Sequence, residues 1–383
     1  MFLHAVLVSC ALQSADAPAL KFERTRIGDS KVIYEAASAC DVNNDGVLDI
    51  VSGEYWFQGP DFKAAHKICD VAYQSEYHDD FSDYPMDVNG DGYVDIVTGG
   101  WFCAKLAWRE NPKGGTGLWT THDIDACGNV ETVRFWDADG DGHVDVVPNA
   151  GGRVAYYSLV RDAAGKGTGK FTKHVVKPDG CGHGLGFGDV NGDGRGDFII
   201  PDGWIEAPED RAKGAWAFHP EFKLGSASVP ILVHDVNGDG RADLIVGQAH
   251  NYGLDWYEQV LKDGTRSWVK HSIDATRSQY HDLVLADIDN DKELELITGK
   301  RYRAHNGHDP GGNDPIGLYY FENRGGLWER VTLDYGPATH ASGAGIYFWV
   351  ADIDGNGWLD IIAPGKEGLY LFKNKGRLSG DSH

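Results

Sequence analysis

The chain has 383 residues, including 51 glycines and 12 tryptophans, and its formal net charge is −23. Such acidity disfavours nucleic acids and anionic membrane surfaces as partners, and the sequence lacks the run of about 18 apolar residues that a membrane span requires. The composition is typical of a globular β protein rich in turns.

Residues 1–17 are predicted to be an export signal, because an apolar stretch over residues 2–12 precedes the small-x-small sequence Ala15-Asp16-Ala17. The sequence Leu7-Val8-Ser9-Cys10 also resembles a lipoprotein box, in which case Cys10 would carry a lipid anchor. A disordered N-terminus is the third alternative. We therefore expect an exported protein, periplasmic or extracellular.

Seven acidic turns of the form Asp-x-Asp/Asn-x-Asp/Asn-Gly-x-x-Asp/Glu follow, at intervals of 46 to 65 residues. Each is preceded by an apolar strand and followed by a β-branched strand. The interval is that of a four-stranded propeller blade and is too long for a pair of helices. The sequence therefore predicts an all-β fold, a single seven-bladed propeller over residues 20–376 with a tail at 377–383. The turns start at Asp41, Asp87, Asp137, Asp189, Asp235, Asp287 and Asp352.

Third and fourth strands complete most of the predicted blades. Tryptophan marks the start of the fourth strand in three repeats, at Trp119, Trp268 and Trp328. The seventh repeat has no fourth strand, whereas residues 20–27 read as a strand ahead of the first turn. We expect this N-terminal strand to pair into the last blade, which would close the ring and remove its exposed edges. The predicted third strands span residues 105–109, 154–159, 253–259, 317–323 and 368–374.

The turns are predicted to bind up to seven structural Ca²⁺ ions. Side chains at positions 1, 3, 5 and 9, with the carbonyl of position 7, can supply the oxygen ligands that calcium takes, and glycine at position 6 permits the bend. An EF-hand is excluded, because the glutamate at position 12 and the flanking helices are missing. In the sixth turn Lys292 replaces the glycine, which predicts the weakest site. The predicted ligands are Asp41, Asn43, Asp45, Asp49, Asp87, Asn89, Asp91, Asp95, Asp137, Asp139, Asp141, Asp145, Asp189, Asn191, Asp193, Asp197, Asp235, Asn237, Asp239, Asp243, Asp287, Asp289, Asp291, Glu295, Asp352, Asp354, Asn356 and Asp360.

This pattern resembles the FG-GAP or VCBS repeat of seven-bladed propellers, a group that includes the integrin head. The resemblance covers nearly the whole chain after residue 20. It implies that the turns bind calcium and serve structure, so that a functional site has to lie elsewhere.

The opposite face of the ring is the predicted site. If each turn joins the first and second strands on one face, the residues about six positions before each turn lie on the other face, around the central channel. Four of these seven are ionisable, and they can hold Zn²⁺, Mg²⁺ or Mn²⁺ on the axis, or act as acid and base without a metal. The seven are Glu35, Phe81, Glu131, His183, Val229, His281 and Ile346, and the predicted central ligands are Glu35, Glu131, His183 and His281.

Further candidates lie near these positions or follow the second strands. Tryptophan faces stack on sugar rings, although packing between blades is the alternative for each tryptophan. Blade six also carries an insertion over residues 301–315, which is expected at the mouth. Its His305, His308 and Asp309 are candidate metal ligands or substrate contacts, and a solvated loop is the alternative. The other catalytic candidates are His78, Tyr77, His340, Arg301 and Tyr302, and the substrate-binding candidates are Trp56, Trp101, Trp204, His250, Lys300 and His305.

Two segments, Cys181-Gly-His-Gly-Leu-Gly-Phe-Gly-Asp189 and Gly299-Lys-Arg-Tyr302 running on through Ala304-His-Asn-Gly307, resemble the propeller domain of the aldos-2-ulose dehydratase family. That family eliminates water from keto-sugars such as 1,5-anhydrofructose. The resemblance implies a carbon–oxygen lyase. The residue roles are assigned from position: a metal held by some of the central ligands would polarise a ketone, His78 or Tyr77 would take the proton, and the β-oxygen would leave.

Two other functions stay open. One is a non-catalytic propeller that binds a glycan or a protein at its mouth. The other is a lyase of uronate polysaccharides, in which Arg301 or a lysine would neutralise the sugar carboxylate; the acidity of the chain disfavours a long polyanion. For either enzyme we expect a carbohydrate substrate, and a monomer or a small homo-oligomer.

Overall fold

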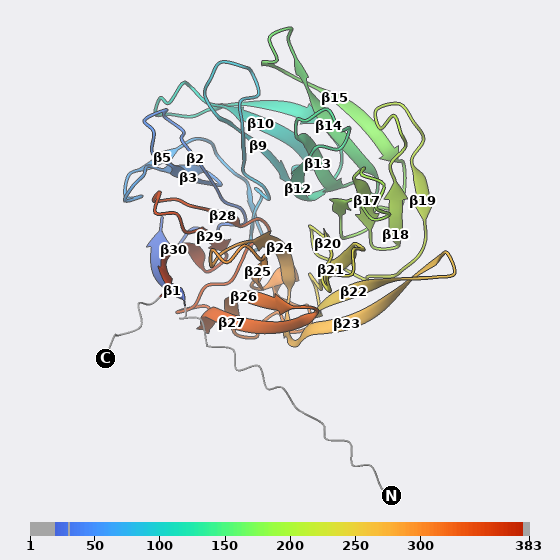
Figure 1. The fold of residues 1–383 in the computed structure, drawn as a ribbon. Coiled ribbons are helices and arrows are strands. Elements are labelled where there is room, and N and C mark those ends of the chain that lie inside the picture. The colour runs from blue at the N-terminus through green and yellow to red at the C-terminus, as the bar shows by residue number, and fades with distance from the viewer. Residues whose placement is uncertain (1–19, 30, 378–383) are drawn as a thin grey trace, which may run out of the picture.

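The computed structural model describes residues 20–29 and 31–377, which form a ring of seven four-stranded antiparallel sheets (Figure 1). The predicted all-β, seven-bladed fold is confirmed. The predicted export signal, Cys10 and most of the C-terminal tail lie outside the described residues. Within the described ranges, no helix is long and apolar enough to cross a membrane.

Each blade runs from an inner strand at the channel to an outer strand at the rim. Blades one to three are β2 (Ser38–Cys40), β3 (Asp49–Ser52), β4 (Tyr55–Phe57) and β5 (Ala65–Lys67); β8 (Tyr84–Met86), β9 (Asp95–Gly100), β10 (Lys105–Glu110) and β11 (Thr120–Asp125); and β12 (Val130–Trp136), β13 (Asp145–Ala150), β14 (Val154–Arg161) and β15 (Gly167–Lys177). Blades four and five are β16 (Gly186–Gly188), β17 (Asp197–Ile200), β18 (Gly203–Glu206) and β19 (Ala217–His219), and β20 (Leu232–His234), β21 (Asp243–Gly247), β22 (Tyr252–Lys262) and β23 (Thr265–Ser278). Blade six is β24 (Tyr280–Ala286), β25 (Glu295–Lys300), β26 (Ile316–Arg324) and β27 (Leu327–Gly336).

Blade seven contains strands from both ends of the chain. Its first three strands are β28 (Trp349–Ala351), β29 (Asp360–Gly365) and β30 (Gly368–Arg377), and its outer strand is β1 (Leu20–Ile27). β1 pairs antiparallel with β30, from Leu20 opposite Arg377 to Ile27 opposite Leu369, and Figure 1 shows the two strands side by side. Outside the blades, β6 (Tyr73–Gln74) and β7 (Tyr77–His78) form a small hairpin, and residues Ala304–Gly307 form a 3₁₀ turn.

The seven acidic turns join the first and second strands, and in five of them the buried carboxylate at position nine also accepts a backbone N–H in or just after the third strand. In the fourth turn, Asp197 Oδ2 accepts the backbone N–H of Val190 at 3.0 Å, and Asp197 Oδ1 accepts that of Ala207, which follows β18, at 2.8 Å. This carboxylate therefore holds three strands in register before any ion is considered.

Position six of every turn has a positive φ, between +79° and +90°. Glycine adopts this conformation without strain, and six of the seven turns contain it. In the sixth turn Lys292 has a φ of +79° and its N–H still donates to Asp287 Oδ2 at 3.1 Å. The lysine is thus held in the conformation of the glycine that it replaces.

Apolar side chains fill the space between neighbouring blades. Val97 and Leu106 of blade two, for example, pack in one cluster with Val133 and Val146 of blade three, and all four are fully buried. The second strands that supply many of these residues, such as β13 and β25, are buried along their whole length. The strands therefore form a rigid frame for the loops at the channel mouth.

Candidate metal and substrate site

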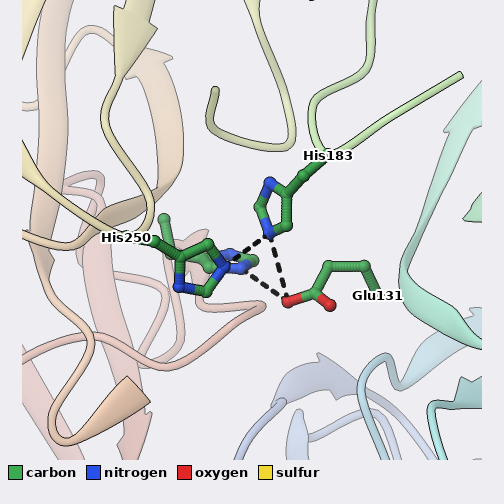
Figure 2. Close-up of side chains that lie close together, drawn as sticks. Glu131, His183 and His250 are labelled. Atoms are coloured by element: carbon green, nitrogen blue, oxygen red, sulfur yellow. Dashed lines mark hydrogen bonds and ion pairs between the residues drawn. The ribbon is translucent and has the colours of Figure 1, made fainter. Parts of the chain in front are cut away.

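Four ionisable side chains from four blades converge at the channel mouth. Glu131 lies in β12, His183 precedes β16, His250 follows β21 and His281 lies in β24. Glu131 Oε1 is 2.9 Å from His281 Nε2 and 3.4 Å from His183 Nε2, and the Nε2 atoms of His183 and His250 are 2.9 Å apart. Figure 2 shows Glu131, His183 and His250 directed toward one point.

This arrangement fits a divalent metal ion. The four ligand atoms lie within 4.8 Å of one another, and Zn²⁺ with bonds of about 2.0–2.1 Å in a tetrahedron spaces its ligands roughly 3.3 Å apart. The other ring nitrogens support the same orientation, because His183 Nδ1 lies 2.8 Å from the carbonyl oxygen of Ala227 and His250 Nδ1 lies 2.8 Å from Asp309 Oδ2. Such contacts leave the Nε2 lone pairs facing the centre.

The protonation states also suit a cation. Burial opposes ionisation of Glu131, but the nearby His183 and His281 hold its pKa well below the ordinary value. Burial lowers the pKa of His281, and burial with the neighbouring His183 lowers that of His250 to about 4. Only His183 has a raised pKa, because Glu131 outweighs its burial. A carboxylate and neutral imidazoles are the forms that coordinate metals.

Glu35 lies apart from this cluster, so its predicted role as a ligand is wrong in this geometry. Arg301 stands between the two glutamates, with Nη1 3.3 Å from Glu131 Oε1 and Nε 3.6 Å from Glu35 Oε2. Glu35 is 2% exposed, and neither of its oxygens has a hydrogen-bond partner within the described ranges. His250, which the sequence suggested as a substrate contact, takes the fourth place instead.

Below the cluster, Arg134 crosses the channel. Its Nη2 atom lies 2.6 Å from Asp282 Oδ1 of blade six, and it also donates to the carbonyl oxygens of Val229 and Ile346, which precede the inner strands of blades five and seven. Arg134 is three residues further along β12 than Glu131, toward the acidic turns. Arg134 therefore links blade three to blades five, six and seven beneath the cluster.

Two hollows of about 310 Å³ each adjoin the cluster, and both are lined by Trp101 and Glu131. The first has an aromatic wall of Tyr77, Phe81 and Phe102, and Arg301, His305 and Asn306 add polar groups. The second is lined by Asn129, Asn149, His183 and several glycines. Volumes near 300 Å³ are those of small-ligand pockets, and an apolar wall with a few convergent polar groups is typical of them.

The insertion of blade six reaches the mouth, as its position after β25 predicts. Asp309 connects two histidines, with Oδ2 2.8 Å from His250 Nδ1 and Oδ1 2.9 Å from His305 Nδ1. The rings of His250 and His305 are stacked, with centroids 4.4 Å apart. Together the three side chains form a second group able to hold a metal, which shares His250 with the first.

Lys300 fastens the insertion and does not face the hollows. Its buried Nζ donates to Ser278 Oγ at 2.8 Å and to the carbonyl oxygen of Gly311. Across the mouth, Arg303 Nη2 pairs with Glu76 Oε1 at 2.7 Å, which joins the insertion to the β6–β7 hairpin. The prediction of Lys300 as a substrate contact is therefore wrong, because its charge is used within the loop.

Other candidates also lie elsewhere. Trp56 and Trp204 are 2% and 1% exposed, because they belong to the third strands β4 and β18 and stack on His66 and His219. His340 lines a separate hollow between β27 and β1.

Three further catalytic candidates come from the β6–β7 hairpin and the start of the insertion, and only one of them lines the first hollow. His78 is buried beside Asp80, and burial lowers its pKa. Tyr302 is half-buried at the start of the insertion and does not line either hollow. Tyr77 alone of these three faces the first hollow.

Sequence reasoning missed Phe102, Asn129 and Asn149 as lining residues. Asn149 lies in the second strand β13, and Asn129 comes directly before β12. Their places relative to the strands were a usable signal, since Trp101 and His183 occupy similar places. Their residue types, however, carry no distinctive pattern.

The acidic turns present oxygen atoms suited to a hard cation. In three turns, three carboxylates approach one another closely enough to share an ion. In four turns, position three is asparagine, whose amide oxygen is an equivalent donor. The three carboxylate groups are Asp137, Asp139 and Asp145; Asp287, Asp289 and Asp291; and Asp352, Asp354 and Asp360.

Comparisons with known proteins concern the fold. The model of the FG-GAP-like repeat matches residues 87–147 and 235–298, and no curated protein matches the chain. Similar solved structures include an Agrocybe aegerita lectin described as recognising non-reducing terminal N-acetylglucosamine, with 15% identity, 91% of each chain covered and a TM-score of 0.44. The V. cholerae biofilm matrix protein Bap1 has 10% identity, coverage of 94% of this chain and 92% of its own, and a TM-score of 0.49. The chain is a seven-bladed β-propeller that contains FG-GAP-like repeats.

Proposed function

We propose that this propeller binds a carbohydrate at its mouth around a divalent metal ion, and that it breaks a carbon–oxygen bond of a keto-sugar or keto-glycoside by β-elimination. The observation that carries the proposal is the convergence of Glu131, His183, His250 and His281 beside two ligand-sized hollows. A residue that merely lines the channel depends on one blade. This cluster, by contrast, is assembled from one side chain of each of four blades.

Three imidazoles and one carboxylate are a donor set for Zn²⁺ or Mn²⁺. When bound, such a cation acts as a Lewis acid toward a ketone oxygen and so acidifies the neighbouring C–H bond. The resemblance of residues 181–189 and 299–307 to the aldos-2-ulose dehydratase family supports the same reaction class.

Side chains of the first hollow can accept and donate the protons that the elimination transfers. His305 lines this hollow, and Asp309 at its Nδ1 atom leaves Nε2 free to accept a proton from the carbon beside the ketone. The electrons of that C–H bond form the double bond as the C–O bond breaks. Burial raises the pKa of Tyr77, which keeps its hydroxyl protonated and able to protonate the leaving oxygen. Arg301 can stabilise the negative charge that develops on the ketone oxygen.

The test is elimination by metal-loaded protein. Chain reconstituted with Zn²⁺ or Mn²⁺ should convert 1,5-anhydrofructose or a keto-glycoside into an unsaturated ketone, followed by ultraviolet absorbance. His183→Ala should reduce turnover at least 100-fold, because the metal loses a ligand. The matched control is His174→Ala, a histidine of the rim that stacks on Tyr156. Full turnover by His183→Ala would refute the assignment.

Non-catalytic glycan binding is the second candidate. Trp101 is 40% exposed at the mouth between the two hollows, and such a face can stack on a sugar without any chemistry. This candidate predicts calorimetric sugar binding that Trp101→Ala weakens and no product from wild type. The uronate lyase is less favoured, because the net charge of −23 opposes the approach of a long polyanion.

A further inference from the structure

Three blades contain the same series of contacts between an acidic turn and the outermost strand. In blade four, Nδ2 of Asn191, at position three of the turn, donates to Glu206 Oε1 at 3.4 Å. The other oxygen of Glu206 accepts from His219 Nε2 at 2.8 Å. The ring of His219 stacks on Trp204 with centroids 4.2 Å apart. A turn on one face is thus linked to the fourth strand at the rim.

Blades two and five repeat these contacts. Asn89 donates to Glu110 at 3.3 Å, and Glu110 accepts from His122 at 2.7 Å. Asn237 donates to Glu258 at 3.5 Å, and Glu258 accepts from His271 at 2.8 Å. Both histidines stack on a tryptophan, with centroid distances of 4.3 Å and 4.4 Å. The same series of contacts thus occurs in blades two, four and five.

The seven repeats vary together at these positions. Each glutamate stands two residues after an aromatic residue of the third strand. Where position three of the turn is asparagine, this third-strand position is Glu or Gln; where it is aspartate, the position holds Ser158, Phe372, or Glu322, which pairs with Arg324 instead. In sequence, the asparagine repeats combine Asn43 and Gln58, Asn89 and Glu110, Asn191 and Glu206, and Asn237 and Glu258. In the first of them Asn43 Nδ2 donates to Asp45 Oδ2 instead.

The chemistry of the amide explains this variation. Asparagine presents an oxygen on one side and NH₂ on the other, and only the oxygen can bind a cation. A carboxylate that accepts from the NH₂ fixes which side faces the turn, whereas aspartate has oxygen on both sides and needs no such partner. In blade four Asn191 Oδ1 does face inward, since it accepts the N–H of Asp193 at 3.0 Å. Asn191 Nδ2 also donates to Asp193 Oδ2 at 3.0 Å, but that carboxylate would be taken by the ion.

We propose that Glu110, Glu206 and Glu258 are positioning residues for calcium, which hold the amide oxygen of the asparagine toward the ion. The histidine of the outermost strand holds each glutamate in turn. Calcium binding is thereby linked to the docking of the fourth strand in blades two, four and five. The role depends on calcium binding by the turns, which a titration of wild type measures separately.

The test is calcium titration calorimetry of the full chain after removal of metal. The triple variant Glu110→Ala, Glu206→Ala, Glu258→Ala should bind calcium about 10-fold or more weakly at a subset of the turns, since the loss of an outer partner costs roughly 10–100-fold in metal affinity. Glu322→Ala, the same substitution at the equivalent position of blade six, is the matched control and should change nothing. Glu206→Gln should retain affinity, because the glutamine oxygen still accepts from the amide.

A second series separates positioning from a general loss of structure. With Asn89→Asp, Asn191→Asp and Asn237→Asp in place, the three alanine substitutions should cause no loss of calcium affinity, because either side of the aspartate carboxylate presents an oxygen to the ion. An equal loss in the asparagine and aspartate backgrounds overturns the positioning role, as does unchanged binding in the triple variant. A wild-type chain that binds no calcium overturns this role and the calcium prediction together. If the triple variant does not fold, Glu206→Ala with and without Asn191→Asp gives the same comparison in one blade.

Discussion

Asp309 is the residue on which the orientation of His250 depends. Its carboxylate lies 2.8 Å from His250 Nδ1, and no other partner of that atom occurs in the part of the chain that the structure describes. Asp309→Asn should therefore weaken Zn²⁺ or Co²⁺ binding about 10–100-fold, because the amide can donate to Nδ1, which places the ring proton on Nε2, the atom that faces the metal. Competition with a chelator measures the affinity, and the visible spectrum of Co²⁺-loaded protein reports the changed ligand set.

Asp314→Asn is the control for this prediction. Asp314 belongs to the same insertion and bonds the hydroxyl of Tyr252 at 2.5 Å, away from the cluster. Identical metal affinity in wild type and Asp309→Asn would remove Asp309 from the centre and leave it as a loop residue.

The choice between His250 and Glu35 was not predictable from the sequence. Both were correctly expected near the mouth, because their offsets from the acidic turns are local. Which side chains touch across the ring depends on Arg301, whose guanidinium occupies the space between Glu35 and Glu131. The position of Arg301 follows from the path of an irregular insertion. The sequence of this insertion has no repeating pattern from which its path could be predicted.

At the scale of the element, the sixth turn shows how a non-glycine residue at position six affects the free energy of unfolding. Lys292 is held at a φ of +79°, where a side chain is strained by about 1–2 kcal/mol. Lys292→Gly should raise the free energy of unfolding by roughly 1 kcal/mol, since the greater chain entropy of unfolded glycine offsets part of the relief. Urea unfolding in saturating calcium measures it. Gly194→Lys in the fourth turn, at a φ of +85°, should have the opposite sign; two effects of the same sign would contradict the argument.

The strands were largely predictable, because the turn spacing and the apolar runs are local signals. The expected third strand at residues 105–109 corresponds to β10, and that at 317–323 to β26. The burial of Trp56 and Trp204 between neighbouring sheets was not predictable in the same way. The hairpins after β3 and β17 have only two connecting residues, so these tryptophans fall within the third strand and face the neighbouring sheet, where a longer link would have left them at the mouth.

At the scale of the molecule, the net charge of −23 reflects the acidic turns, and seven bound divalent ions would offset more than half of it. Without ions, the carboxylates at position nine are costly. Burial raises the pKa of six of them to about 6 and that of Glu295 to about 7. These groups therefore connect folding, calcium and pH.

The sign of the pH effect should differ with and without calcium. A carboxylate whose pKa is raised in the folded state contributes stability that is present below its unfolded pKa of about 3.9 and lost as the pH rises through 6 to 7. In EDTA these groups should make the fold less stable at pH 7.5 than at pH 5. Calcium binds the ionised form, so the increase in Tm between EDTA and excess calcium should be larger at pH 7.5 than at pH 5. Thermal melts under the four conditions measure this, and an equal calcium effect at both values would show that the turns do not bind through these carboxylates.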